Sequence, residues 1–214
     1  QLWKNGTLIN IEKVALEGEM EDSSATGPFA SCVRWYAVLC LFYLVVGASW
    51  VLDINKKGLR IRIRQAGVPQ WKMICFNSAA PLLICSAGYL TAGTLCCILT
   101  DESLLRLAEG FVPMLIYLVG LLGVTLLTAS LLRNILSLMF IAPVLTFLNG
   151  VLSGLMFEMP AWAYVLKWIS GAFPGRWLNE SIAAPLAFLP WAFSCCAGWM
   201  FVGITASTLR SKRQ

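Results

Sequence analysis

The chain has 214 residues, of which 58% are hydrophobic and only 13% are charged. A soluble domain of this length usually carries about 25% charged residues, so the composition excludes a soluble globular domain. The net charge of +5 comes without any histidine, which leaves zinc hydrolysis and histidine-based nucleophilic catalysis without their usual residue. The basic balance is typical of the cytoplasmic anchors of a membrane protein, and no basic and aromatic pattern for nucleic acid accompanies it.

The eight cysteines lie mostly inside apolar runs, where cysteine behaves as a small hydrophobic residue. No two of them are spaced as in a CxxC motif, and adjacent cysteines in a helix point to different faces. We therefore expect neither a metal site nor disulfide chemistry.

Residues 1–29 are polar and acidic, and they end in a linker rich in Ser, Gly and Pro. They contain no apolar core of a signal peptide. We expect this segment to be the tail of an extracellular region, and we expect the transmembrane domain to extend over residues 30–214. An outside segment without a signal of its own predicts a further span upstream.

Five apolar runs follow, each of about 20 residues, the length that crosses about 30 Å of hydrocarbon as a helix. They predict an all-α fold, namely a polytopic membrane helical bundle of about five transmembrane helices. The predicted spans are residues 31–52, 74–99, 111–132, 136–157 and 188–207.

The basic residues predict the orientation, because Lys and Arg concentrate in cytoplasmic loops. Ten of the 16 Lys and Arg residues fall on one side of the five spans. We expect this side, which carries the C-terminus, to be cytoplasmic. The N-terminus of the sequence would then lie outside, in a multi-pass protein of the plasma (inner) membrane.

The loop between the first two spans, residues 53–73, carries six basic residues and one acid. An anchor on anionic lipid explains the charges. It does not explain the apolar residues of the loop or the presence of Gly67 and Pro69. Apolar and basic residues alternate with the period of a strand, yet a lone strand at a membrane surface has no bonding partner. We expect the loop to dock on a cytoplasmic partner through Gly58, Arg60, Ile61, Arg62, Ile63, Arg64, Gly67, Val68, Pro69 and Trp71.

Between the fourth and fifth spans, residues 158–186 form an apolar segment that is longer than a simple connection needs. Its prolines delimit two predicted short helices, at about 161–170 and 177–184. One interpretation of its aromatic residues is an ordinary belt at the membrane interface. The other is an outer gate, formed by Pro160, Trp162, Trp168, Pro174 and Trp177.

No Asp, Glu, Lys or Arg lies at the centre of a predicted span. This argues against a proton-coupled pump and against a channel with charged rings. Three polar residues within the spans stand out, namely Asn77, Asn149 and Ser153. Asn149 and Ser153 lie one turn apart beside small residues, which suits helix packing, and contact with a substrate in a pathway is the alternative.

The order of these features resembles the permease subunit of the ABC-2 type of ABC transporter, from its second to its sixth span. The resemblance rests on Lys-Lys-Gly-Leu-Arg at 56–60, Ala-Gly-Val-Pro at 66–69, Asn77 and Pro81, residues 140–154, Met-Pro-Ala-Trp at 159–162, and a basic C-terminal tail. One departure is Asn55, in a loop where the family often carries an acidic residue.

The resemblance implies that the loop at 53–73 carries a coupling helix, which docks on an ATP-binding cassette ATPase subunit, and that short re-entrant or interfacial helices cover the exit. It also implies a second permease subunit, in a homodimer or a heterodimer within the lipid bilayer. ATP and Mg²⁺ would bind to the ATPase subunit, because this sequence has no Gly-x-x-x-x-Gly-Lys-Ser/Thr phosphate loop. The chain itself would bind no cofactor and would have no catalytic residue.

The expected function is that of the transmembrane permease subunit of an ATP-driven exporter. A mostly apolar pathway suits an amphiphilic or hydrophobic cargo, such as a drug, a peptide, a lipid or a lipid-linked glycan. Two alternatives remain. One is a non-catalytic membrane scaffold or assembly subunit, and the other is a membrane-embedded enzyme that modifies lipid.

Overall fold

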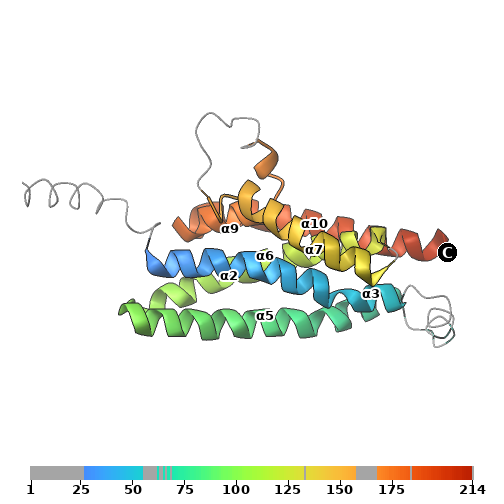
Figure 1. The fold of residues 1–214 in the computed structure, drawn as a ribbon, viewed down its shortest axis with the longest axis horizontal. Coiled ribbons are helices and arrows are strands. Elements are labelled where there is room, and N and C mark those ends of the chain that lie inside the picture. Colours follow the sequence, from blue (N-terminus) through green and yellow to red (C-terminus); the bar gives the residue numbers. More distant parts are fainter. Residues whose placement is uncertain are drawn as a thin grey trace, which may run out of the picture.

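The computed structural model of the protein describes residues 27–54, 62, 65, 67, 69–132, 134–157, 168–183 and 185–213. Over these residues every regular element is a helix, and none is a strand (Figure 1). In chain order the helices are α2 (Pro28–Gly47), α3 (Ser49–Ile54), α5 (Gln70–Thr100), α6 (Leu104–Leu131), α7 (Ile135–Leu152), α9 (Pro174–Ala183) and α10 (Pro185–Arg213).

Five helical stretches are long and apolar enough to cross a membrane. They are Pro28–Asp53, Trp71–Thr100, Leu104–Leu131, Ile135–Leu152 and Ala187–Arg210. The predicted all-helical fold and the predicted number of span-length helices are therefore confirmed for the part of the chain that the structure describes.

The fourth of these helices is shorter than we predict from hydropathy. The predicted span runs to residue 157, whereas α7 ends at Leu152. Gly154 has a φ of +71°, and the Leu155 amide donates to the carbonyl of Gly150 over 3.0 Å. A left-handed glycine with such a back-donated bond is a common way to end a helix. The apolar residues that follow hide this ending from a hydropathy pattern.

Helix α6 lies at the centre of the bundle (Figure 1). In its most apolar stretch 56% of the residues are buried, more than in any of the other four span-length helices. Leu118, Leu121 and Leu126 are fully enclosed. A helix that is apolar on all sides is suited to such a position.

Helices α6 and α10 approach one another through glycine. A Cβ atom added to Gly123 would lie 2.4 Å from the carbonyl group of Trp199, and one added to Gly203 would lie 2.4 Å from the carbonyl oxygen of Gly123. Contact of backbone with backbone at small residues is the usual way in which membrane helices pack closely. This contact makes the α6–α10 pair a structural unit of the bundle.

Arg210 joins the same two helices near their ends. Its Nη1 donates to the carbonyl oxygens of Ala129 (3.3 Å), Ser130 and Leu132 (2.6 Å). The last carbonyls of a helix have no partner within the helix, and a cation beside them is also favoured by the helix dipole. Arg210 therefore caps α6 from α10.

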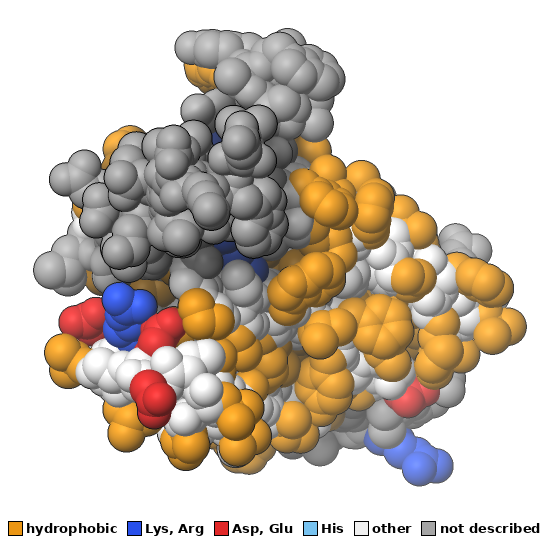
Figure 2. Space-filling model, turned by 60° about the vertical axis from the view of Figure 1, so that its left-hand side comes forward, with side chains coloured by type: hydrophobic (Ala, Val, Ile, Leu, Met, Phe, Trp, Pro, Cys, Tyr) orange, Lys and Arg blue, Asp and Glu red, His pale blue; other side chains and the backbone are white. Residues whose placement is uncertain are grey.

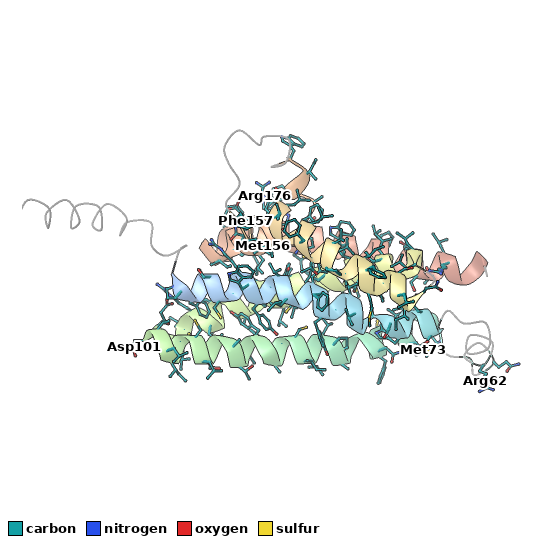
Figure 3. The ribbon with its side chains drawn as sticks, in the orientation of Figure 1. Arg62, Met73, Asp101, Met156, Phe157 and Arg176 are labelled. Carbon is teal, nitrogen blue, oxygen red and sulfur yellow. The ribbon has the colours of Figure 1, made fainter. Side chains whose placement is uncertain are left out.

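The bundle has two ends of different character. Arg62, Met73 and the C-terminus lie at one end, and Asp101 and the start of α2 lie at the other (Figures 1 and 3). When the end that carries Asp101 is brought forward, the coloured part of the surface is largely apolar, with a group of acidic and basic side chains at the left and further acidic and basic side chains at the lower right (Figure 2). Arg62 and Met73 of the predicted basic loop therefore lie at the end of the bundle opposite to Asp101 (Figure 3).

The orientation of the bundle can be tested by cysteine labelling, because Gln65 is exposed and the side chain of Trp168 is 82% exposed. In a variant without the eight native cysteines, we expect a membrane-impermeant maleimide to label Trp168→Cys in intact cells. We expect Gln65→Cys to react only after permeabilisation, because the distribution of Lys and Arg predicts that the basic loop lies inside. Labelling of Gln65→Cys in intact cells would contradict this topology.

Candidate functional site

The predicted docking loop is described only in part. The residues Gly58, Arg60, Ile61, Ile63, Arg64 and Val68 lie outside the described residues. Arg62 and Gly67 are exposed, and Gly67 has a φ of +67°, a conformation that favours glycine. Pro69 immediately precedes the first residue of α5, so the chain enters this helix from an extended proline.

Trp71 stands on the first turn of α5 and is 55% exposed. The ammonium group of Lys72 lies 5.7 Å from the centre of its ring, within the range of a cation–π contact. A large aromatic side chain exposed at the end of a span is suited to the membrane interface or to a contact with another protein. Trp71 is therefore the best-defined apolar feature of the docking loop.

Asn77 lies two turns further along α5, and its side chain is exposed on the surface of the bundle. Polar side chains within membrane spans usually find a partner in another helix. Its neighbour Ser78 is buried, and its hydroxyl has no hydrogen-bond partner among the described residues. Asn77 therefore presents a polar group on the outer surface of α5, whereas the Ser78 hydroxyl lies inside the bundle.

Asn149 and Ser153 form a buried polar network with Tyr117 of α6. The Tyr117 hydroxyl donates to the carbonyl of Ala37 over 3.0 Å, and the Asn149 amide donates to the Tyr117 oxygen over 3.2 Å. Ser153 donates to the Asn149 side-chain oxygen over 3.3 Å. The network joins α2, α6 and α7, and this geometry favours helix packing over substrate contact for both predicted residues.

Sequence reasoning missed Tyr117 and assigned no partner to Arg34. Arg34 lies within α2, and its Nε donates to the Asn179 side-chain oxygen of α9 over 2.8 Å. A polar group within an apolar run needs a partner, and that requirement was the available signal for both residues. The Arg34–Asn179 bond attaches the short helix α9 to the first span.

The candidate gate residues fall into different surroundings. Pro160 and Trp162 lie outside the described residues, and Trp168 is exposed. Pro174 is the first residue of α9 and is buried, a position that suits proline because it needs no amide donor. The structure therefore gives a packed setting to Pro174 and not to Trp168.

Trp177 is held by three contacts. Its Nε1 donates to the carbonyl of Gly171 over 2.9 Å, and its ring stacks on Trp191 with a centroid distance of 6.1 Å and an interplanar angle of 15°. The guanidinium of Arg176 lies 5.8 Å from the ring centre. Trp199 of α10 also donates, to the carbonyl of Ala172 over 2.5 Å. The turn before α9 is thus fixed to α10 by two tryptophans.

These tryptophans border an apolar groove on the side of the bundle. The groove has a volume of about 670 Å³ and is lined by residues that include Leu127, Trp177, Trp191, Cys195 and Trp199. Sites for drug-sized ligands usually measure about 300–1,000 Å³. The groove is therefore large enough for an apolar small molecule or for part of a lipid.

In the described part of the chain, no group of three His, Cys, Asp or Glu side chains could hold a metal ion, and all eight cysteines are free thiols. Comparison with family models, with curated proteins and with solved structures gives no match. The functional argument therefore depends on the residues and on the fold.

Trp177→Ala is expected to destabilise the protein, because it removes the stack on Trp191 and the bond to Gly171. Truncation of a buried tryptophan to alanine typically lowers the free energy of unfolding by about 3–5 kcal/mol. Because Trp177 is only partly buried, its truncation should lower the free energy of unfolding by about half of that. Thermal unfolding in detergent, followed by far-ultraviolet circular dichroism, measures the effect. Trp168→Ala is the matched control and should leave the melting temperature unchanged. Equal melting temperatures for the two variants would contradict the observed packing.

Proposed function

We propose that this chain is the transmembrane subunit of an ATP-driven exporter of the ABC-2 type, which moves an amphiphilic or hydrophobic cargo outward. The observation that carries the proposal is the division of the bundle into two ends. Arg62 and Met73 of the basic loop and the last part of α10 belong to one end, and the start of α2 and Asp101 belong to the other (Figures 1 and 3). Such a division suits a protein that takes up force on one side and releases cargo on the other.

The basic end supports a partner in the cytoplasm. Because Lys and Arg mark the cytoplasmic side, the loop at 53–73 would meet an ATPase subunit there, with its apolar residues making the contact. Trp71, exposed beside this loop, provides an aromatic anchor of the kind that is enriched at protein interfaces. ATP and Mg²⁺ would remain on the ATPase subunit.

The other end supports the release of cargo. The short helix α9 is tied to α2 through Arg34 and to the turn before it through Trp177, so it can change position only together with these contacts. The exposed Trp168 lies just before this turn. A gate in this region would make Trp168→Ala leaky for cargo without loss of stability.

The apolar groove and the absence of charge at the centres of the spans suit a cargo with a large apolar part. A second permease subunit would complete the pathway, and the exposed amide of Asn77 is one group on the described surface that such a neighbour could cover. The subunit would lie in the plasma membrane, with the C-terminus in the cytoplasm.

The test is purification of the full-length protein from its native membrane through an affinity tag. We expect an ATPase subunit with a phosphate loop to copurify, together with a second permease, which is detected with a differently tagged copy. ATP hydrolysis by this complex should disappear when the phosphate-loop lysine of the ATPase subunit is replaced by alanine. A folded protein that purifies without any ATPase would favour the scaffold alternative and would overturn the proposal.

A further inference from the structure

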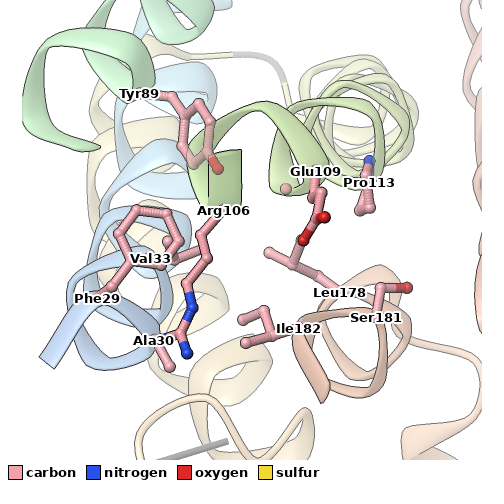
Figure 4. Close-up of a pocket in the computed structure, with 11 residues that line it drawn as sticks. Phe29, Ala30, Val33, Tyr89, Arg106, Glu109, Pro113, Leu178, Ser181 and Ile182 are labelled. Carbon is pink, nitrogen blue, oxygen red and sulfur yellow. The ribbon is translucent and has the colours of Figure 1, made fainter. Parts of the chain in front are cut away.

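A small cavity opens at the end of the bundle that carries Asp101. It has a volume of about 190 Å³ and lies between the first turns of α2, the last part of α5, the start of α6 and the helix α9 (Figure 4). Arg106 and Glu109 of α6 both point into it, and Leu178 and Ile182 of α9 close the opposite side. Opposite charges therefore line a space that is otherwise largely apolar.

Arg106 has donors to spare in this cavity. Its Nη1 binds the Glu102 carboxylate over 2.9 Å. A guanidinium carries five N–H donors, and the other donors of Arg106 have no partner among the residues that the structure describes. An anionic group that enters the cavity would find a planar cation with free donors, which is the geometry that binds phosphate and carboxylate well.

Glu109 lies one turn beyond Arg106 on the same helix. Its carboxylate makes no hydrogen bond or ion pair with any residue in the described ranges. Residues three apart on a helix can form an ion pair, yet Arg106 pairs with Glu102 instead. Glu109 thus presents an acceptor with unused capacity to the cavity.

The two hydroxyl groups in the wall add no further donor. Tyr89 donates its proton to the carbonyl of Leu107 over 3.4 Å, and Ser181 donates to the carbonyl of Trp177 over 2.6 Å. Both oxygens keep lone pairs that can accept. Among the described side chains of the wall, the donors come from Arg106 and the acceptors come from Glu109, Tyr89 and Ser181. A ligand that satisfies this wall combines one anion with one group that donates several hydrogen bonds.

The size and the position of the cavity restrict the ligand further. A volume of about 190 Å³ corresponds to about six water molecules and lies below the range for drug-sized ligands. The cavity lies where α2 and α6 begin, at Pro28 and Leu104, and the ends of spans lie at the depth of the lipid headgroups. The space therefore fits a headgroup and not a whole amphiphile.

We propose that this cavity binds a small zwitterion with a primary ammonium group and a phosphate or carboxylate. The anion would lie against Arg106, and the ammonium would donate to Glu109. The source that the position favours is the headgroup of phosphatidylethanolamine, and a free solute of the same chemistry is the other source. The proposal does not depend on what the bundle transports or on whether an ATPase drives it.

The test measures binding of short-chain phospholipids with identical acyl chains to the purified full-length protein in detergent. Phosphatidylethanolamine is expected to bind about tenfold more tightly than phosphatidylcholine or phosphatidylglycerol, which is the scale of one hydrogen bond to a charged group. Choline is a cation without an N–H donor, and glycerol is a donor without charge, so the comparison isolates the ammonium.

Three variants assign this preference to the cavity. Glu109→Gln should remove the preference for the ethanolamine headgroup. Arg106→Gln should weaken the binding of all three lipids. Asp101→Asn removes an acid from the same end and keeps the left-handed backbone (φ 54°) that asparagine tolerates, so binding should not change. Glu109 is exposed and has no partner among the described residues, so its variant remains informative even if Arg106→Gln fails to fold.

Free phosphoethanolamine and free phosphocholine distinguish the two sources. A Glu109-dependent preference for ethanolamine among the lipids assigns the cavity to the headgroup. If the preference appears among the free compounds and not among the lipids, the cavity binds a soluble zwitterion. Equal affinities in both series, or a preference that persists in Glu109→Gln, would overturn the proposal.

Discussion

Gly123→Ala is expected to destabilise the bundle strongly. The added methyl group would lie 2.4 Å from the Trp199 carbonyl and 2.5 Å from the Met200 amide nitrogen, and both are backbone atoms of α10. Overpacking of a core usually costs about 1–3 kcal/mol when side chains can rearrange. Here a whole helix must move, so we expect the cost to reach or exceed about 3 kcal/mol. Unfolding in detergent, by heat or by titration with a denaturing detergent, measures it.

Gly198→Ala is the matched control for this variant. Gly198 lies on α10, one residue before Trp199, and a Cβ atom there meets nothing within 4 Å. Alanine has a helix propensity about 1 kcal/mol more favourable than glycine, so this variant should be as stable as the native protein or slightly more stable. If the two alanine variants unfold alike, the close α6–α10 contact is not part of the folded protein.

The docking loop gives the largest expected effect on activity. Replacing Ile63 and Val68 together by serine should lower cargo-stimulated ATP hydrolysis by the complex at least tenfold. Fewer than about 30% of interface residues contribute more than 1 kcal/mol, and we expect this pair to be among them; about 1.4 kcal/mol for the pair corresponds to a factor of ten in affinity. Both residues lie outside the described part of the chain, so the expectation rests on the sequence pattern. ATP hydrolysis by the reconstituted complex, with and without cargo, is the measurement.

The control for the docking loop removes charge and keeps the apolar residues. A basic residue near an anionic membrane contributes about 1 kcal/mol to lipid attraction, so Arg62→Gln with Arg64→Gln should weaken a lipid anchor. If this pair abolishes ATPase stimulation and the serine pair leaves it intact, the loop acts through lipid and not through docking. Membrane insertion should be the same for both pairs.

The number of span-length helices could be predicted from the sequence because each apolar run has the length of the hydrocarbon layer. Their pairing could not be predicted in the same way. Phe76 faces outward and Leu118 faces the centre, yet both are apolar, because lipid and protein interior offer similar surroundings. The end of α7 was also hidden, since Gly154 ends the helix within an apolar stretch.

The candidate site was predictable where polarity stands out against an apolar background. Asn149 and Ser153 were identified in this way, but Tyr117, which completes their network, counts as hydrophobic in composition and was missed. Arg106 and Glu109 do not stand out in the sequence, because the cavity that they line forms between segments far apart in the chain. A single sequence contains no direct signal that distant segments come together around a cavity.

The most direct test of the proposed exporter is cargo uptake into inside-out vesicles that contain the purified complex. Export from the cell corresponds to uptake into such vesicles, so a fluorescent amphiphile should accumulate when ATP is added. Accumulation should disappear when the phosphate-loop lysine of the ATPase subunit is replaced, and it should persist in Gly198→Ala. Accumulation that is independent of ATP, or no accumulation of any drug, peptide, lipid or lipid-linked glycan, would contradict the proposed function.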